Sequence, residues 1–195
     1  SLMGQTGSVT KWQSSVLGDF TDAVDHSNTT TSLPLINITA TASYRAVVKS
    51  GVCQEAYATA ARITADPVHT IQLSSSNNSQ TICTGTGIVP IVYTLGGGAT
   101  GATLSGTGSA GLVVNVVGNQ ATISGTPTAS GAFSITTTNS NNVCTGESLT
   151  GSITLDPVSV GGTVNSTQSV CSGSDITLSL MGQTGSVTKW QSSVL

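Results

Sequence analysis

The sequence predicts an all-β protein made of tandem antiparallel β-sandwich modules in an extended array. Three observations support this prediction: an internal repeat, short runs in which polar and apolar residues alternate, and cysteines at regular spacing. Short strands that recur at regular intervals are typical of sandwich domains. No stretch shows the 3.6-residue apolar period that indicates an amphipathic helix.

The longest repeat joins the two ends of the chain. Residues 1–17 and 179–195 both read SLMGQTGSVTKWQSSVL, an identity too long to arise by chance. The offset from Ser1 to Ser179 is therefore the period of the sequence. Self-similarity of this kind is the signature of a repeat architecture. We expect the chain to be one window of a longer array.

A second, weaker repeat divides this period into two modules of nearly equal length. The segment ITADPV at 63–68 recurs as ITLDPV at 153–158. The Asp-Pro pair in each copy favours a change from a final strand to an extended linker. The sequence thus predicts an incomplete module at 1–67 that lacks its first strands, a complete module at 68–157, and the start of the next module at 158–195.

Strand patterns occur in both modules. In the complete one, hydroxyl residues alternate with Ile123, Phe133 and Ile135, which is the period of a half-buried strand. Gly118-Asn119 between two expected strands is a hairpin signal. The expected strands are 88–95, 112–117, 120–124, 132–138 and 148–155 in this module, and 9–14, 42–48 and 57–64 in the first.

The four cysteines follow the weaker repeat, since Cys53 recurs as Cys144 and Cys83 recurs as Cys171. The interval from Cys83 to Cys144 nearly equals the interval from Cys171 to the next counterpart of Cys53. These equal spans predict one disulfide in each module, with Cys83 bonded to Cys144, and with Cys53 and Cys171 bonded to cysteines of adjacent repeats. Buried, reduced cysteines are the alternative.

Disulfides would place the protein outside the cytosol. The cysteines have neither CxxC spacing nor a histidine nearby, so we expect no metal site among them.

Few residues carry charge. Asp, Glu, Lys and Arg make up 7% of the chain, whereas Ser and Thr supply 61 of its 195 residues. With five basic residues and a net charge of −3, the surface lacks the basic footprint of a nucleic-acid-binding protein. The apolar runs are shorter than the ~20 residues that a membrane-spanning helix needs. We expect no nucleic-acid partner.

Two kinds of motif could carry chemistry, and each has a simpler interpretation. Residues 96–101 and 106–111 satisfy G-x-G-x-x-G, but no acidic residue follows at the spacing of a dinucleotide site, so we expect glycine-rich connections. Asp19, Asp22 and Asp25 cluster closely in sequence, and calcium takes oxygen ligands of this kind. Their spacing matches no EF-hand loop, and a solvated loop would have the same composition.

His26 and His69 have no acidic or cysteine partner close in sequence, and we expect both on the surface. Trp12, which recurs as Trp190, is expected in a sandwich core, with carbohydrate stacking as the alternative. Because no acid–base constellation is visible, we expect a protein that is not an enzyme, with no catalytic residue and no cofactor.

Several segments are similar to known repeats. Residues 43–53 (SYRAVVKSGVC), 170–174 (VCSGS) and 187–193 (VTKWQSS) resemble the Ig-like repeats of very large Bacteroidetes surface proteins. Residues 91–102 (IVYTLGGGATGA) and 121–127 (ATISGTP) are similar to the PKD-like repeats found beside them. The resemblance covers most of the chain and implies tandem Ig-like and PKD-like sandwiches, with no catalytic residues to carry over.

Such proteins are exported by the type IX secretion system, and the best known are SprB-type adhesins of gliding bacteria. The resemblance implies an extracellular protein at the cell surface, attached to the outer membrane. Its partners would be neighbouring repeats of the same polypeptide, surface polysaccharide, and the type IX secretion and gliding machinery.

We therefore expect a structural and adhesive segment of a surface filament that extends a distal binding region for attachment and gliding motility. Two alternatives remain, namely a spacer array of a secreted polysaccharide-degrading enzyme and a carbohydrate-binding module.

Overall fold

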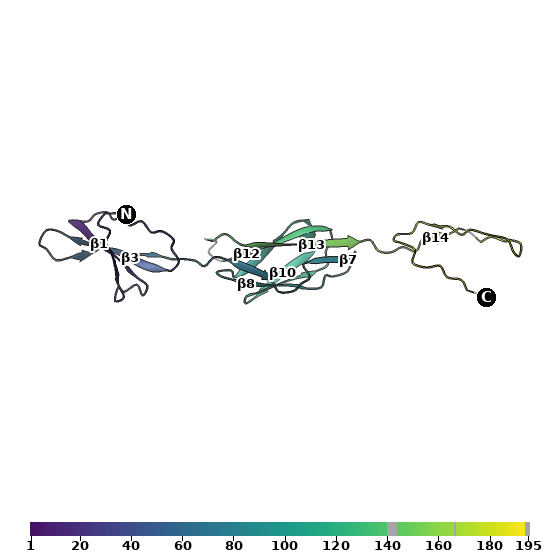
Figure 1. Ribbon diagram of the computed structural model, residues 1–195, viewed down its shortest axis with the longest axis horizontal. Helices are drawn as coiled ribbons and strands as arrows, with labels where there is room; N and C mark the ends of the chain where they lie inside the picture. Colours follow the sequence, from purple (N-terminus) through teal and green to yellow (C-terminus); the bar gives the residue numbers. More distant parts are fainter. Residues whose placement is uncertain (140–143, 166, 194–195) are drawn as a thin grey trace. The chain divides into compact units, whose positions relative to one another are not determined.

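The computed structural model describes residues 1–139, 144–165 and 167–193 (Figure 1). In this part of the chain the regular structure is almost wholly β, and the exception is a three-residue 3-10 helix, η1 (Thr107–Ser109). The predicted all-β class is confirmed. No helix of the described residues is long and apolar enough to cross a membrane.

The chain divides into two compact units, which meet in sequence between Val68 and His69, and Cys144 belongs to the first of them. This division falls beside the boundary expected at 67/68. It does not separate 158–193 from the second unit.

Residues 69–156 form a sandwich of two four-stranded sheets. Its strands are β6 (Thr70–Leu73), β7 (Ser79–Cys83), β8 (Ile91–Gly96), β9 (Gly101–Ser105), β10 (Leu112–Val117), β11 (Gln120–Gly125), β12 (Gly131–Thr138) and β13 (Ser148–Asp156). One sheet has the order β10-β11-β8-β6 and the other β7-β13-β12-β9. This is the strand order of a constant-type immunoglobulin domain, with strands A, B, E and D in one sheet and C, F and G in the other.

One strand pairing in the sandwich is parallel. β7 pairs with β13 from Ser79–Ser152 to Cys83–Asp156, whereas the other named pairings are antiparallel. The module is thus the antiparallel sandwich that the sequence predicts, with one parallel pairing added at the edge of one sheet. The first strand is split into β6 and β7, which join different sheets. β7 runs alongside the last strand toward the end of the module where the chain leaves.

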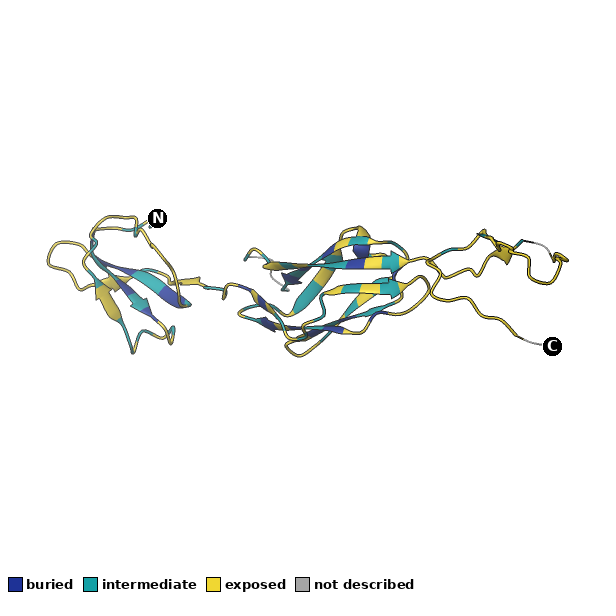
Figure 2. Cartoon of the chain, turned by 45° about the vertical axis from the view of Figure 1, so that its right-hand side comes forward, coloured by how far each residue is buried: buried dark blue, intermediate teal, exposed yellow. Residues whose placement is uncertain are grey.

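The core lies between the two sheets. β8 buries Ile91, Tyr93 and Leu95 at alternate positions, and β12 does the same with Phe133 and Ile135. Successive side chains of a strand point to opposite faces, so this pattern places one face of each sheet inside. Figure 2 shows the buried residues gathered on the strands of this sandwich. The other buried members are Ile71, Ile88, Ala121, Ile123 and Ile153.

Residues 1–66 form one five-stranded sheet. Its strands are β1 (Ser8–Ser15), β2 (Val24–His26), β3 (Ala42–Lys49), β4 (Ala56–Tyr57) and β5 (Ala61–Ile63). The order is β2-β1-β3-β4, and β5 pairs with the other end of β3. A small cluster of Val9, Ala46 and Val48 lies on one face, with Leu2, Trp12 and Ala58 packed against it. No second sheet forms within these residues to cover that face.

The described part of 158–193 is mostly exposed, and its two short strands, β14 (Thr163–Val164) and β15 (Leu180–Met181), pair with each other (Figure 2). Its register repeats that of β6 and β8. As Ile71 pairs with Leu95 in the sandwich, Val160 forms a bridge with Thr184 in the same region of the following module. The weaker sequence repeat thus recurs as a repeat of backbone pairing.

Candidate functional site

The cysteines lie at the ends of the modules, and all four are unpaired. Cys83 ends β7 opposite Asp156, the last residue of β13. Cys144 lies shortly before Ser148, the first residue of that strand. A strand of this length spans about 26 Å at roughly 3.3 Å per step. The Cα atoms of the two cysteines therefore lie much farther apart than the ~7 Å that a disulfide tolerates.

The predicted Cys83–Cys144 disulfide is therefore corrected. The sequence spacing was compatible with it, but the topology places the two cysteines at opposite ends of β13. The pairing of Cys53 and Cys171 with adjacent repeats stays a prediction.

Asp22 organises the loop that follows β1. Its carboxylate accepts hydrogen bonds from the Ser15 hydroxyl and from the backbone N–H groups of Val16 at 2.9 Å and Leu17 at 3.2 Å. Hydrogen bonds to a carboxylate favour its charged form. They lower the pKa of Asp22, and the Ser15 hydroxyl contributes most.

The other candidate ligands in this loop have partners of their own. Asp19 accepts hydrogen bonds from the N–H of Thr21 at 3.0 Å and its hydroxyl at 2.7 Å, which lower the pKa of Asp19. His26 is half-buried, with Nε2 2.8 Å from the Ser14 hydroxyl. The described residues contain no group of three or more His, Cys, Asp or Glu side chains that could hold a metal ion.

Asp25 belongs to a polar network on one face of the first sheet. Its carboxylate accepts from Lys11 Nζ at 2.7 Å and from Gln13 Nε2 at 2.8 Å, and Gln13 Oε1 accepts from Arg45 Nε at 2.9 Å. Asp25, Gln13 and Arg45 are directly opposed across β2, β1 and β3, so they share a face. The bond with Lys11 lowers the pKa of Asp25 and raises that of Lys11.

The Arg45 guanidinium lies between two aromatic rings. Its Cζ is 4.0 Å from the ring centroid of Phe20 and 3.9 Å from that of Tyr57, which is cation–π geometry. Phe20 has a φ of 63°, an unusual value for a bulky residue. The ring contact joins this loop to the face of β3 that carries Arg45. Sequence reasoning missed this site because its three residues are widely spaced and fit no motif.

The opposite face of this sheet carries Trp12. The side chain packs against Val9, Ala46 and Val48, and the indole N–H donates to the Thr30 carbonyl at 3.0 Å. Trp12 is therefore half-buried by contacts within the first unit, rather than presented flat to solvent.

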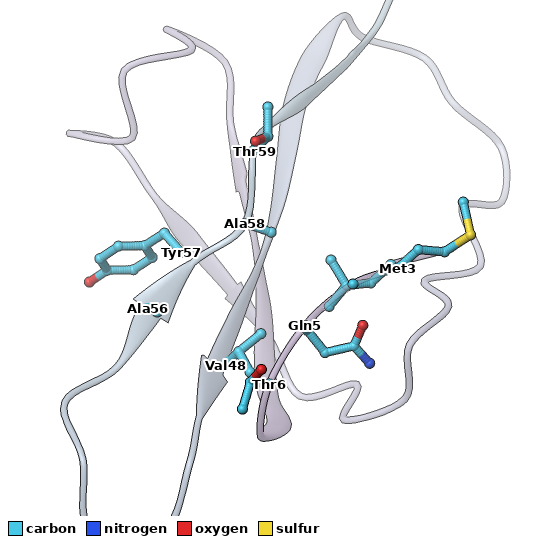
Figure 3. Close-up of a pocket in the computed structure, with 10 residues that line it drawn as sticks. Met3, Gln5, Thr6, Val48, Ala56, Tyr57, Ala58 and Thr59 are labelled. Atoms are coloured by element: carbon cyan, nitrogen blue, oxygen red, sulfur yellow. The ribbon is translucent and has the colours of Figure 1, made fainter.

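An open hollow of about 300 Å³ lies beside this cluster (Figure 3). The ring of Tyr57 points away from Met3 and Gln5 and toward Arg45 on the far face. The lining thus offers apolar, hydroxyl and amide groups rather than a paired acid and base. The lining residues are Leu2, Met3, Gly4, Gln5, Thr6, Val48, Ala56, Tyr57, Ala58 and Thr59.

His69 is buried, which corrects the expectation of a surface histidine; only 2% of it is exposed. Its Nδ1 lies 3.3 Å from the Thr137 hydroxyl, which also accepts from the N–H of Glu147 at 2.8 Å. The Glu147 carboxylate accepts from the N–H of Ile71 at 2.8 Å. This network joins β6 to the segment before β13 at the end where the chain enters the sandwich.

The two glycine motifs connect strands, as expected. Residues 96–101 join β8 to β9, and 106–111 join β9 to β10 and contain η1. So short a helix cannot supply the N-terminal turn on which a dinucleotide phosphate is bound.

Asp22→Asn should destabilise the first unit at neutral pH. Because the pKa of Asp22 is lowered in the folded state, its carboxylate stabilises the fold above about pH 4. That stability is lost as the pH falls through the lower, folded pKa. Urea unfolding followed by Trp12 fluorescence in a Trp190→Phe background should give a lower midpoint for the variant at neutral pH.

Well below the folded pKa the two proteins should unfold at the same urea concentration, because the carboxyl group is then protonated in both states. The matched control is Asp175→Asn, outside the loop. Equal midpoints at neutral pH would show that Asp22 does not hold the loop.

Comparison with known families gives one match. A family model described as a domain of unknown function (DUF8696) matches residues 1–67. A comparison with curated proteins finds no match. The first sheet and its loop are therefore similar to a domain whose function is not assigned.

Proposed function

We propose that the chain is a structural and adhesive repeat segment of an extracellular surface filament, which extends a distal binding region for surface attachment and gliding motility. The observation that carries this proposal is the identity of residues 1–17 and 179–195. A catalytic domain rarely repeats itself, whereas a filament gains length from each added copy.

The two copies of the repeated segment support an array because they form complementary parts of a module. In the first copy, Ser8–Ser15 is strand β1 and pairs with β3, but Leu2 and Met3 lie outside the strands. In the second copy the same Leu-Met pair is β15 and pairs with β14. A module that joins both sets of pairings would cover the open face of the first sheet.

The side-chain chemistry favours a structural role over the two alternatives. Trp12 packs on its own cluster, and one face of the Tyr57 ring is covered by Arg45, so both rings already have contacts within the first sheet. The charged groups Lys11, Asp25 and Arg45 are bonded within the first sheet. The alternative of a spacer array in a polysaccharide-degrading enzyme requires a catalytic domain elsewhere in the same polypeptide, and finding one there would favour it.

In this proposal the filament is attached to the outer membrane and reaches the surface through the type IX secretion system. Neighbouring repeats are the direct partners of each module. Surface polysaccharide is the ligand class of the distal region, and the gliding machinery moves the filament.

The test is the length of the filament. Each full repeat should advance it by roughly 70–90 Å, given strands of up to about ten residues in two end-to-end modules. Electron microscopy of the intact protein, and of variants with one or three repeats deleted in frame, should show length falling in proportion, with weaker attachment and gliding. An advance below about 50 Å per repeat would indicate modules packed side by side. Unchanged attachment in the shortened variants would contradict the adhesive role.

A further inference from the structure

The cysteines of the sandwich lie at its two ends. Cys83 is exposed and pairs in the β-ladder with Asp156, and the next N–H, that of Thr84, donates to the Asp156 carbonyl at 2.9 Å. Pro157 follows at once. Cys83 is thus held beside the point where the chain leaves the module, and we refer to this position as the exit cysteine.

Cys144 lies at the other end. Its Sγ donates to the carbonyl of Asp66 at 3.4 Å, and Asp66 lies just before the module. The nearby Glu147 is fixed by its bonds to Thr137 and Ile71. Cys144 is therefore held where the chain enters the module, and we refer to this position as the entry cysteine.

The first unit repeats this arrangement. Cys53 corresponds to Cys144 and follows the Lys49 end of β3. The chain leaves by way of β5, which pairs with the opposite, Ala42 end of β3. Cys53 is exposed and is also an entry cysteine. Cys171 corresponds to Cys83 and is the exit cysteine of the following module.

We propose that disulfides join successive modules of the array, each between the exit cysteine of one module and the entry cysteine of the next. Cys83 bonds to the counterpart of Cys53 in the following module, and Cys144 bonds to the counterpart of Cys171 in the preceding one. The inference rests on the proposed array, since it needs a neighbouring copy. Neither bond falls inside this chain, which agrees with its four unpaired thiols.

The repeat brings the two kinds of cysteine to the same place. At every Asp-Pro junction an exit cysteine belongs to the module that ends and an entry cysteine to the module that begins. Pairing within a module would instead have to bridge the length of β13. Each junction thus holds one complete pair, and no cysteine is left over.

The bond forms by thiol–disulfide exchange outside the cytosol. The two thiols pass two electrons and two protons to the disulfide of a thiol–disulfide oxidoreductase, which becomes a dithiol. Their two sulfurs form one S–S bond. The bond would tie the modules on either side of a short proline-containing linker, so the junction would resist bending and extension.

Peptide mapping of the intact, non-reduced protein tests the pairing. Trypsin releases residues 50–62, which contain Cys53 alone, and chymotrypsin then separates Cys83 from Cys144 at Tyr93 and Phe133. Cleavage after Glu147 separates Cys144 from Cys171. We expect Cys53 peptides linked to Cys83 peptides, and Cys144 peptides linked to Cys171 peptides. A Cys83–Cys144 link, or free thiols throughout, would overturn the proposal.

Single variants in the full-length protein give a second measurement. Cys83→Ser in one repeat should expose one thiol to maleimide, on the 50–62 peptide, whereas the matched Cys144→Ser should expose Cys171. Exposure of Cys144 in the Cys83→Ser protein would show pairing within the module. The dilute 195-residue chain should keep four reactive thiols in the buffer that oxidises the full-length protein, and loss of two of them would contradict junction pairing.

These outcomes are independent of the filament itself. If the thiols were free but the filament still lengthened with repeat number, the proposed disulfides would be contradicted. The proposed function would not be.

Discussion

Replacing Phe133 with alanine should lower the free energy of unfolding of the 68–157 module by about 3–5 kcal/mol. Phe133 is 1% exposed and lies among the largest fully buried side chains of the core. Its loss removes apolar burial and leaves a cavity between the two sheets, which the surrounding strands cannot fill. Urea unfolding of the 195-residue chain, followed by far-ultraviolet circular dichroism, should show the unfolding transition of this module move to lower urea.

Val113→Ala is the matched control for this variant. Val113 also lies on a strand of the module, β10, but is 62% exposed. Exposed positions of this kind usually change stability by about 0.5 kcal/mol or less. If the two variants unfolded at the same urea concentration, the inter-sheet core would not be the source of the module's stability.

Gly111→Ala should cost about 2–4 kcal/mol of unfolding free energy, through backbone strain and overpacking together. Gly111 has a φ of 82°, and a Cβ there would lie 2.2 Å from the Thr126 carbonyl oxygen and 3.2 Å from Pro127 Cα. Both atoms belong to the backbone and cannot rotate away as a side chain could. The overlap is removed only if the segment before β10 moves away from the end of β11. The measurement is the same urea transition.

Gly118→Ala separates the two causes. Gly118 also has a positive φ, 59°, but a Cβ there would meet no atom within 4 Å. We expect it to cost only about 1–2 kcal/mol, from the conformation alone. A Gly111 variant no less stable than the Gly118 variant would show that the close approach to Thr126 is unimportant.

The strands of the core were predictable because their residues alternate in burial. The expected strand 112–117 is β10, and 120–124, 132–138 and 148–155 begin and end within one residue of β11, β12 and β13. β6, β7 and β9 were missed. β9 begins in a glycine-rich segment and β7 is mostly polar, so neither shows the apolar half of the pattern.

The repeated segment shows why local sequence was insufficient elsewhere. Ser8–Ser15 is a strand, whereas the identical residues at 186–193 are not. The difference is the presence of β3, which supplies the hydrogen-bonding partner for the first copy. Trp12 is half-buried as a result, and Trp190 is 55% exposed. A segment forms a strand only when a second segment pairs with it, so the sequence of one segment alone does not predict whether it becomes a strand.

The disulfide prediction failed for a related reason. Equal spans between cysteines constrain how far apart they lie in sequence, but not on which end of a strand each one lies. The decisive information was the parallel register of β7 and β13, which no local pattern contains.

That parallel register also determines how the module responds to mechanical load. The chain enters beside His69 and leaves after Asp156, so tension on its two ends pulls β7 and β13 in opposite directions along their common axis. Their residue pairs, from Ser79–Ser152 to Cys83–Asp156, are then sheared together. An antiparallel hairpin pulled from its open end would instead lose its bonds one at a time. In the proposed filament, drag on the distal region would load this ladder in shear, so that its residue pairs resist the force together.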